Sequence, residues 1–423
     1  MNAEILVIGD EILLGLITDT NSAYISRRLA QYGVAVTRIT KVGDQTEIIA
    51  DALRASSSRA SLVISCGGLG PTHDDKTRDA AALFLNVPLQ LNESALKEIE
   101  TLYVKAGRTM SAANRVQAMI PEGAMYLSNE RGTAPGLHFI KGDTAFFCFQ
   151  GVPKEMEWMT ENYLIPFVQK KPSSHVVRYK TIRTTGIPES NLFETLRSQV
   201  QSYRERLDIA FLPKLTVGVD LRFTVQNMTA EKADSLLNEA EQAFRQAIES
   251  TYPHGVYGEG TISLEDVVAD LLFRHNLTIA TAESCTGGLI AHRLTNVPGS
   301  SRYFMQGITT YSNAAKVQHV GVTQTLLDEH GAVSEPVVRA MAEGMRRVAQ
   351  TDIAIATTGI AGPTGATEAK PLGLAYVALA TASGTHVFKH SPLPFSIERL
   401  AFKERLSQFA LDRLRHYLIG LSV

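Results

Sequence analysis

The chain has 423 residues, of which 44% are hydrophobic and 20% are charged, and its formal net charge is −2 at pH 7. This length exceeds what one hydrophobic core usually serves, so two or three domains are expected. The near-neutral charge disfavours a dedicated nucleic-acid-binding protein, which normally carries a basic face. Cys66, Cys148 and Cys285 lie far apart without a C-x-x-C pair, which argues against a disulfide framework and a structural zinc site.

The amino-terminal residues read as a first strand, because acidic residues come early and no basic segment precedes the apolar run. No apolar run approaches the roughly 20 residues that a membrane-spanning helix needs. We therefore expect a cytoplasmic protein without a membrane partner.

The first third of the chain alternates strand-like and helix-like segments. Such alternation is typical of βαβ units and predicts a mostly parallel sheet. The expected strands are residues 3–10, 34–43, 60–70 and 144–151, and the expected helices are residues 21–33, 45–59 and 153–168.

The pattern changes after a polar tract at residues 169–175, which contains a proline and two serines and is a predicted linker. Alternating strands at 176–187 and 215–227 and a long amphipathic helix at 229–250 then indicate a small α+β module. A second boundary is predicted at residues 253–262, which contain three glycines.

The βαβ pattern returns in the last part of the chain. Expected helices are 264–276, 287–297, 334–350 and a closing helix from about Ser396, and expected strands are 277–284, 304–312, 352–363 and 374–381. The predicted fold class is therefore α/β: two doubly wound α/β domains joined by the small α+β module. The predicted domains are residues 1–168, 169–257 and 258–423.

Glycines, a hydroxyl and acids gather after the third strand of the first domain. Carboxylates beside an amide-lined pocket suit a divalent cation that bridges a phosphate or pyrophosphate. The alternative interpretation is a set of ordinary acids at a helix amino terminus. The glycines and the hydroxyl are Gly67, Gly68, Gly70 and Thr72, and the predicted metal ligands are Asp10, Glu11, Asp74, Asp75 and Asp79.

In the last domain, residues 283–288 lie where a strand meets a helix. Parallel sheets bind ligands at the carboxyl ends of their strands, and a helix amino terminus favours phosphate or carboxylate. Ser284 and Thr286 add hydroxyls, and Gly287 and Gly288 allow a ligand to approach the backbone. The alternative is a plain turn with a capping serine or threonine.

Two further strand-end loops strengthen the prediction. Lys316 is expected in the first turn of a helix, where the dipole disfavours a cation, so it could act as the base for a serine with Tyr311 relaying or polarising. The alternative is a solvated lysine and a half-buried tyrosine. The loop with Thr358, Gly359 and Gly362 offers amides for a phosphate or an oxyanion, and Arg399 is a candidate phosphate or ribose clamp. With few candidate metal ligands nearby, these loops favour metal-free acyl-type hydrolysis.

These motifs resemble the CinA (competence/damage-inducible) family along nearly the whole chain. Residues 1 to about 168 are similar to its molybdopterin-binding-like domain, of the MoaB/MogA type, in "GDEILLGLITDTNSAYIS", "GGLGPTHDDKT", "NRVQA", "GTAPG" and "GVPKEM". Residues from about 258 are similar to the CinA C-terminal domain in "TAESCTGGLIAHRLTNVPGSS", "GITTYSNAAK", "GAVSEPVVRAMA" and "TGIAGPTG".

The resemblance implies two activities in pyridine-nucleotide salvage. The C-terminal domain is similar to enzymes that hydrolyse nicotinamide mononucleotide (NMN) to nicotinic acid mononucleotide and ammonia without a cofactor. The N-terminal domain is similar to a divalent-metal-dependent ADP-ribose pyrophosphatase. A homodimer is expected, with no direct nucleic-acid partner. One departure is "FSIER", where Ile397 replaces the usual glycine, which affects the loop before Arg399.

We expect Ser301 to attack the carboxamide of NMN, with Lys316 and Tyr311 handling its proton. The rival prediction makes Ser284 the nucleophile and Ser301 a binding residue. Two other classes of function stay open: a pterin-nucleotide enzyme, and a non-catalytic partner in DNA uptake or repair. The residues expected to bind NMN are Glu283, Ser284, Thr286, Gly287, Gly288, Thr358, Gly359, Gly362 and Arg399, and those for ADP-ribose are Gly67, Gly68, Gly70 and Thr72.

Overall fold

The computed structural model describes residues 1–105, 107–170, 176–393, 395 and 397–420, so the predicted linker lies outside it from residue 171 onward. The chain divides into two compact units, Met1–Arg178 with Val225–Leu236 and Tyr179–Thr224 with Leu237–Val423. None of the helices in the described ranges has the length and apolarity needed to cross a bilayer.

The first unit is built on a six-stranded sheet with the order β2-β1-β3-β8-β7-β6. The first four of these strands are parallel, and β7 and β6 are antiparallel. A separate two-stranded ribbon pairs β4 with β5. The elements are β1 (Asn2–Ile8), α1 (Asp10–Leu13), α2 (Asn21–Gln31), β2 (Ala35–Val42), α3 (Thr46–Ser57), β3 (Leu62–Cys66), α4 (Thr77–Leu85), β4 (Leu89–Leu91), α5 (Glu93–Lys105), η1 (Ala112–Ala118), β5 (Met119–Pro121), β6 (Met125–Leu127), β7 (Gly136–Lys141), β8 (Thr144–Phe149), α6 (Pro153–Met159), η2 (Thr160–Leu164) and α7 (Ile165–Gln169).

Both faces of this sheet are covered by helices, which explains why its central strands read as continuous apolar runs. Ile5 of β1 packs on one face with Ile25 of α2 and Met156 of α6. Its neighbour Leu6 points to the other face and packs with Ile49 of α3 and residues of α4. The alternation of side chains along β1 therefore sets both cores.

The middle module is a four-stranded sheet with the order β10-β11-β9-β12 and three helices. The sheet includes β12, which lies in the stretch predicted as a boundary and pairs antiparallel with β9. Strand β12 ends two residues after the predicted limit of the module at residue 257. Its elements are β9 (Val176–Thr184), α8 (Glu189–Thr195), α9 (Arg197–Tyr203), β10 (Asp208–Lys214), β11 (Gly218–Met228), α10 (Ala230–Thr251) and β12 (Val256–Glu259).

The C-terminal domain contains a five-stranded sheet with the order β14-β13-β15-β16-β17. Strands β14, β13 and β15 are parallel, and β16 and β17 are antiparallel. The elements are α11 (Leu264–His275), β13 (Ile279–Glu283), α12 (Leu289–Thr295), η3 (Ser300–Arg302), β14 (Phe304–Thr309), α13 (Asn313–Val320), α14 (Gln324–His330), α15 (Glu335–Ala349), β15 (Ile353–Gly359), β16 (Ala375–Thr381), β17 (Gly384–His390) and α16 (Arg399–Gly420).

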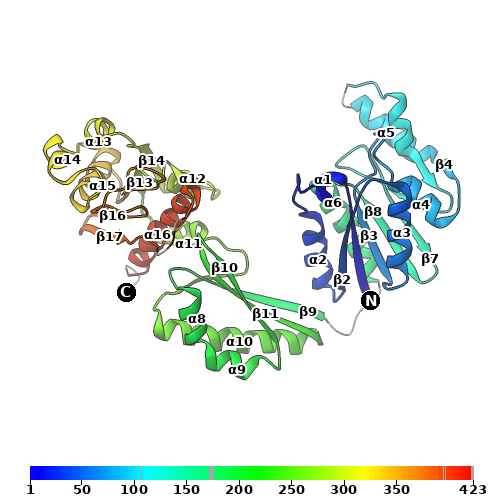
Figure 1. Cartoon of the computed structure of the whole chain (residues 1–423), viewed down its shortest axis with the longest axis horizontal. Coiled ribbons are helices and arrows are strands. Elements are labelled where there is room, and N and C mark those ends of the chain that lie inside the picture. Colours follow the sequence, from blue (N-terminus) through cyan, green and yellow to red (C-terminus); the bar gives the residue numbers. More distant parts are fainter. Residues whose placement is uncertain (106, 171–175, 394, 396, 421–423) are drawn as a thin grey trace. The chain divides into compact units, whose positions relative to one another are not determined.

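Helices again cover both faces of this sheet (Figure 1). Ile279 of β13 packs into the core formed with α11, α12 and α16. Ala280 and Ala282 face the opposite core, which is formed with α13, α14 and α15. Small side chains on this face let α15 pack close, and Gly344 of α15 is so near α13 that a Cβ there would lie 1.7 Å from the Val320 carbonyl oxygen.

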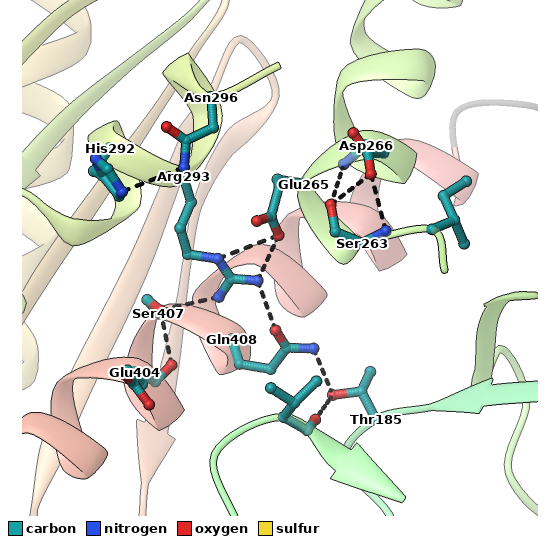
Figure 2. Close-up of polar contacts among 12 residues, drawn as sticks. Thr185, Ser263, Glu265, Asp266, His292, Arg293, Asn296, Glu404, Ser407 and Gln408 are labelled. Carbon is teal, nitrogen blue, oxygen red and sulfur yellow. Dashed lines mark hydrogen bonds and ion pairs between the residues drawn. The ribbon is translucent and has the colours of Figure 1, made fainter. Parts of the chain in front are cut away.

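Within the second unit, α16 joins the C-terminal domain to the middle module (Figure 2). The Arg293 guanidinium donates to Glu265 at 2.7 Å, to Ser407 Oγ at 3.0 Å and to Gln408 Oε1 at 2.7 Å. The Gln408 amide in turn donates to Thr185 Oγ1 of the middle module at 3.2 Å. One polar network thus ties α11, α12 and α16 to the end of β9.

Candidate functional site

The carboxyl ends of β14, β13 and β15 meet at one edge of the C-terminal sheet. In the parallel register, Glu283 at the end of β13 lies beside Thr309 on one side and Thr357 on the other. The three loops singled out in the sequence therefore start from adjacent strands. This edge of the sheet forms the candidate site.

The side chain of Lys316 lies at the centre of this edge. Its Nζ is 3.2 Å from Ser284 Oγ, and it donates to the carbonyl oxygens of Thr310 at 2.8 Å and Tyr311 at 3.3 Å. A neutral amine has two N–H groups and one lone pair. In that form Lys316 can donate to both carbonyls while its lone pair accepts the hydroxyl proton of Ser284.

Burial shifts the protonation of this amine. Lys316 is only 1% exposed, and desolvation lowers its pKa from the ordinary lysine value because a charged ammonium is disfavoured away from water. No carboxylate contacts Nζ within the described ranges, so no neighbouring anion offsets this effect through a direct ion pair. Lys316 is thus suited to act as a base toward Ser284.

The turn after Ser284 provides hydrogen-bond donors next to the hydroxyl. The amides of Cys285 and Thr286 donate to no other residue in the described part of the chain. The turn then passes through Gly287 and Gly288, whose φ angles of 63° and 93° lie in the left-handed region that glycine adopts without strain. An amide directly after a nucleophile is a common oxyanion donor.

Three residues expected to bind NMN are instead occupied inside the protein. Glu283 is 1% exposed, and its carboxylate accepts the amide hydrogens of Gly288, Ile290 and Ala291 at 2.8–3.1 Å. Thr286 Oγ1 lies 2.8 Å from Thr357 Oγ1, and Thr358 Oγ1 donates to the Ala332 carbonyl at 2.8 Å. In this structure the side-chain oxygens of Glu283, Thr286 and Thr358 are hydrogen bonded within the protein, and their binding of NMN stays a prediction. The amides at the start of α12, expected to hold a phosphate, are used by Glu283.

Arg399 at the start of α16 connects the loop after β15, which contains Gly362, to the loop after β14, which contains Tyr311. The Arg399 guanidinium contacts the Gly362 carbonyl and the Tyr311 hydroxyl. Tyr311 is 57% exposed, so its ring borders the site from the solvent side. Gly359 lies further back, where a Cβ would be 2.5 Å from that of Ala375, and it allows β15 and β16 to approach. Ile397 packs against the core beside α16.

Ser301 does not lie with Lys316. It belongs to η3, which precedes β14, whereas Lys316 follows β14. A strand of six residues spans about 20 Å, so Ser301 lies at the opposite edge of the sheet from Ser284. Within one chain of this structure, Lys316 therefore cannot reach Ser301 to activate it. Lys316 does lie within reach of Ser284, the nucleophile of the rival prediction.

In the first unit, the predicted glycine and acid motifs border a cavity of about 550 Å³. Gly67 is required by packing, because a Cβ there would lie 2.1 Å from the Ile8 carbonyl oxygen. The amides of Gly68 and Leu69 have no hydrogen-bond partner in the described ranges, and both residues line the cavity. The Gly70 amide is used, since it donates to the Asp75 carboxylate at 2.6 Å.

The acids expected to bind a metal have different surroundings. The Asp75 carboxylate also accepts the Thr72 amide hydrogen at 2.8 Å and the Thr72 hydroxyl hydrogen at 2.5 Å, so it holds the loop in shape. The Asp10 amide donates to Asp44 at 2.9 Å. Glu11, Asp19, Asp44, Asp74 and Asp75 line the cavity, and Asp10 and Asp79 do not.

Family comparisons agree with this three-part architecture. The family model described as "CinA C-terminal domain" matches residues 261–418, "Probable molybdopterin binding domain" matches 4–170, and "Damage-inducible protein CinA KH domain" matches 179–252. A "CinA-like protein" of Chloroherpeton thalassium is 41% identical over 424 residues, which is 99% of each chain. The chain belongs to the CinA family.

This CinA-family chain is also similar to other proteins. A "Putative competence-damage inducible protein" of Caldicellulosiruptor saccharolyticus is 39% identical over 420 residues, covering 99% of this chain and 100% of its own. A crystal structure of "the protein CinA with unknown function from Thermoplasma acidophilum" is 36% identical, has a TM-score of 0.36, and covers 38% of this chain and 94% of that one.

The acids of the CinA N-terminal cavity do not form a preassembled metal centre. Among the described residues, no group of three or more His, Cys, Asp or Glu side chains is arranged to hold a metal ion. Asp75 is engaged by the loop, and Asp79 lies on the exposed side of α4. The predicted five-residue metal site is therefore not assembled here, and we assign no chemical step to a metal.

Sequence reasoning missed Asp44, although it follows the carboxyl end of β2 and borders the same cavity as the predicted acids. Burial raises the pKa of Asp44, with the nearby carboxylates of Asp10 and Glu11 adding to the effect. Its position two residues after a strand is the sequence feature that could have indicated a place at the cavity. A single acid in the segment "KVGDQ" did not stand out as a motif.

Proposed function

We propose that the C-terminal domain hydrolyses the carboxamide of NMN to a carboxylate and ammonia, with Ser284 as the nucleophile. The observation that carries this proposal is the buried Lys316 amine 3.2 Å from Ser284 Oγ. A serine with an adjacent neutral amine is a known arrangement for acyl transfer. This assignment replaces the expected nucleophile Ser301 with its rival.

The reaction follows from this geometry in two stages. Ser284 Oγ attacks the carboxamide carbon while its proton passes to Lys316 Nζ, and the amides of Cys285 and Thr286 stabilise the oxyanion. Collapse of this intermediate breaks the C–N bond, and Lys316 returns the proton to the departing ammonia. Water then attacks the acyl-serine ester with Lys316 again as base, which releases the carboxylic acid and restores Ser284.

Tyr311 and Arg399 border the same space from the solvent side. The Arg399 guanidinium lies between the loops after β14 and β15, where it can contact a negatively charged part of the substrate. Tyr311 contributes its backbone carbonyl to Lys316 and its hydroxyl to Arg399. We therefore propose a positioning role for Tyr311 in place of the expected proton relay.

The test is ammonia release from NMN by the purified full chain, with and without EDTA, for the wild type, Ser284→Ala and Ser301→Ala. We expect release in both buffers, a loss of about 10³-fold or more for Ser284→Ala, and a change of less than about tenfold for Ser301→Ala. Near-normal turnover by Ser284→Ala would exclude it as the nucleophile. No release by the wild type would reject the deamidase proposal.

For the N-terminal domain we propose hydrolysis of the ADP-ribose pyrophosphate bond. Support comes from the cavity of about 550 Å³, which is lined by Gly68 and Leu69, whose amides have no partner in the described ranges, and by several acids. Whether this activity needs a divalent ion is tested by assaying AMP formation with EDTA and with added Mg²⁺. A pterin nucleotide that raises the melting temperature more than ADP-ribose would favour the pterin-nucleotide alternative.

The middle module gives no support to the nucleic-acid alternative. KH modules hold nucleic acid with a G-x-x-G loop. The sequence of this module matches G-x-x-G at Gly255–Gly258, but Val256–Glu259 is strand β12, paired with β9. We also propose a homodimer, which light scattering on the purified chain would test.

A further inference from the structure

Lys403 lies beside the catalytic turn although no motif pointed to it. It is four residues after Arg399 in α16, so the two side chains share one face of the helix. Its Nζ is 3.2 Å from the position that a Cβ on Gly287 would occupy. The Gly287 amide donates to the Ser284 carbonyl at 3.1 Å, so the ammonium faces the turn that carries the nucleophile.

The positive charges on this face are not neutralised by acids. In the described part of the chain, Lys403 has no ion pair or hydrogen bond, and Arg399 contacts only the uncharged groups of Gly362 and Tyr311. The Lys403 side chain is half-buried, so its charge is screened less than that of a freely solvated lysine. Two unpaired cations in one place favour an anionic ligand.

The other groups expected to hold a phosphate are turned away from this space. Thr286 and Thr358 are buried and hydrogen bonded inside the protein, and the amides at the start of α12 are satisfied by Glu283. The carboxamide and the phosphate of a mononucleotide are separated by a pyridine ring and a ribose. The phosphate must therefore bind away from the Ser284 hydroxyl. Arg399 and Lys403 on α16 are cations beside the turn that could hold it.

We propose that Lys403, together with Arg399, binds the 5′-phosphate of the mononucleotide and makes the site selective for mononucleotides over nucleosides. This inference rests on the proposed deamidase function. Lys403 is then a specificity-determining residue that contributes to substrate binding and takes no part in the proton transfers of Ser284 and Lys316.

The test compares NMN with nicotinamide riboside, which has the same carboxamide and no phosphate. For Lys403→Met we expect the KM for NMN to rise about 10- to 100-fold, as for loss of a charge-assisted hydrogen bond, with kcat nearly unchanged. The kcat/KM for nicotinamide riboside should stay within about twofold of wild type. Lys403→Arg should retain most of the selectivity, and Lys389→Met on β17 controls for loss of one charge in the same domain.

Three results would overturn the proposal: equal losses on both substrates, no change on either, or the same selective loss in Lys389→Met. Calorimetric titration with ribose 5-phosphate separates this question from the deamidase proposal. If the wild type releases no ammonia but binds ribose 5-phosphate at least about tenfold more tightly than Lys403→Met, the phosphate site stands and the deamidase proposal fails. Equal affinities of the two proteins would reject the phosphate site.

Discussion

Replacing Lys316 with methionine tests the base that the site provides for Ser284. Methionine keeps much of the length and apolar character of the lysine stem, but it has no amine within reach of Ser284 Oγ, which Nζ approaches to 3.2 Å. Loss of a general base costs about 10²- to 10⁴-fold in rate, or about 3–5 kcal/mol of transition-state stabilisation. Because Lys316 is 1% exposed and hydrogen bonded to Ser284, Thr310 and Tyr311, we expect KM for NMN to change by less than about threefold.

The assay is steady-state ammonia release from NMN, with folding checked by far-UV circular dichroism and thermal melting. Lys389→Met is the matched control, because it removes an exposed lysine of strand β17 and should turn over like the wild type. A folded Lys316→Met protein that retained more than about one tenth of the wild-type kcat would refute the role of Lys316 as base.

Three further predictions concern pH and stability. The kcat/KM for NMN should rise with pH as Lys316 loses its proton, and it should level off below the ordinary lysine pKa of 10.5, because burial lowers the pKa of Lys316. Between the pKa of Lys316 in the folded protein and 10.5, the unfolded chain binds one more proton than the folded chain. The free energy of unfolding should therefore also rise with pH in this window. Glu283→Ala should destabilise the C-terminal domain by about 3 kcal/mol, because one buried and two partly buried amide hydrogens lose their acceptor. Urea unfolding followed by circular dichroism measures this change. Fluorescence of the single tryptophan, Trp158, reports the N-terminal domain as an internal control. Gly344→Ala should cost about 3 kcal/mol in the same experiment, since its Cβ would overlap the Val320 carbonyl, and an unchanged midpoint would show that α13 and α15 can move apart at little cost.

Most helices and the central strands of both α/β domains could be predicted from apolar runs and their capping residues. Strands β10 and β12 could not. Pro213 lies within β10 and argues against a strand, but β10 is the edge of its sheet, where a missing N–H is tolerated. Gly255 and Gly258 make the region of β12 look like a boundary, and it becomes a strand through pairing with β9.

The candidate site could be predicted as a set of three loops but not as a set of contacts. Ser284 and Ser301 both stand near glycines in the sequence, and only the register of β13 and β14 shows which one lies beside Lys316. The direction of the Glu283 side chain could not be predicted from the sequence either, because an acid at a strand end can face a ligand or cap the next helix. Lys403 escaped prediction because it is one of several charged residues along α16 and meets Gly287 only after folding.

The contacts of α16 along its length affect how a fragment of this chain would behave. Its first two turns carry Arg399 and Lys403 of the proposed site. Further along the helix, Gln408 bonds to Thr185, Arg405 to the Leu215 carbonyl and Arg415 to the His254 carbonyl. A fragment that starts at Ser263 would keep every proposed catalytic group, but three polar side chains of this helix would each lose a partner in the middle module. Kinetic constants from such a fragment would therefore be measured on a site whose helix α16 lacks its contacts with the middle module. The same constants should be measured on the full-length chain for comparison.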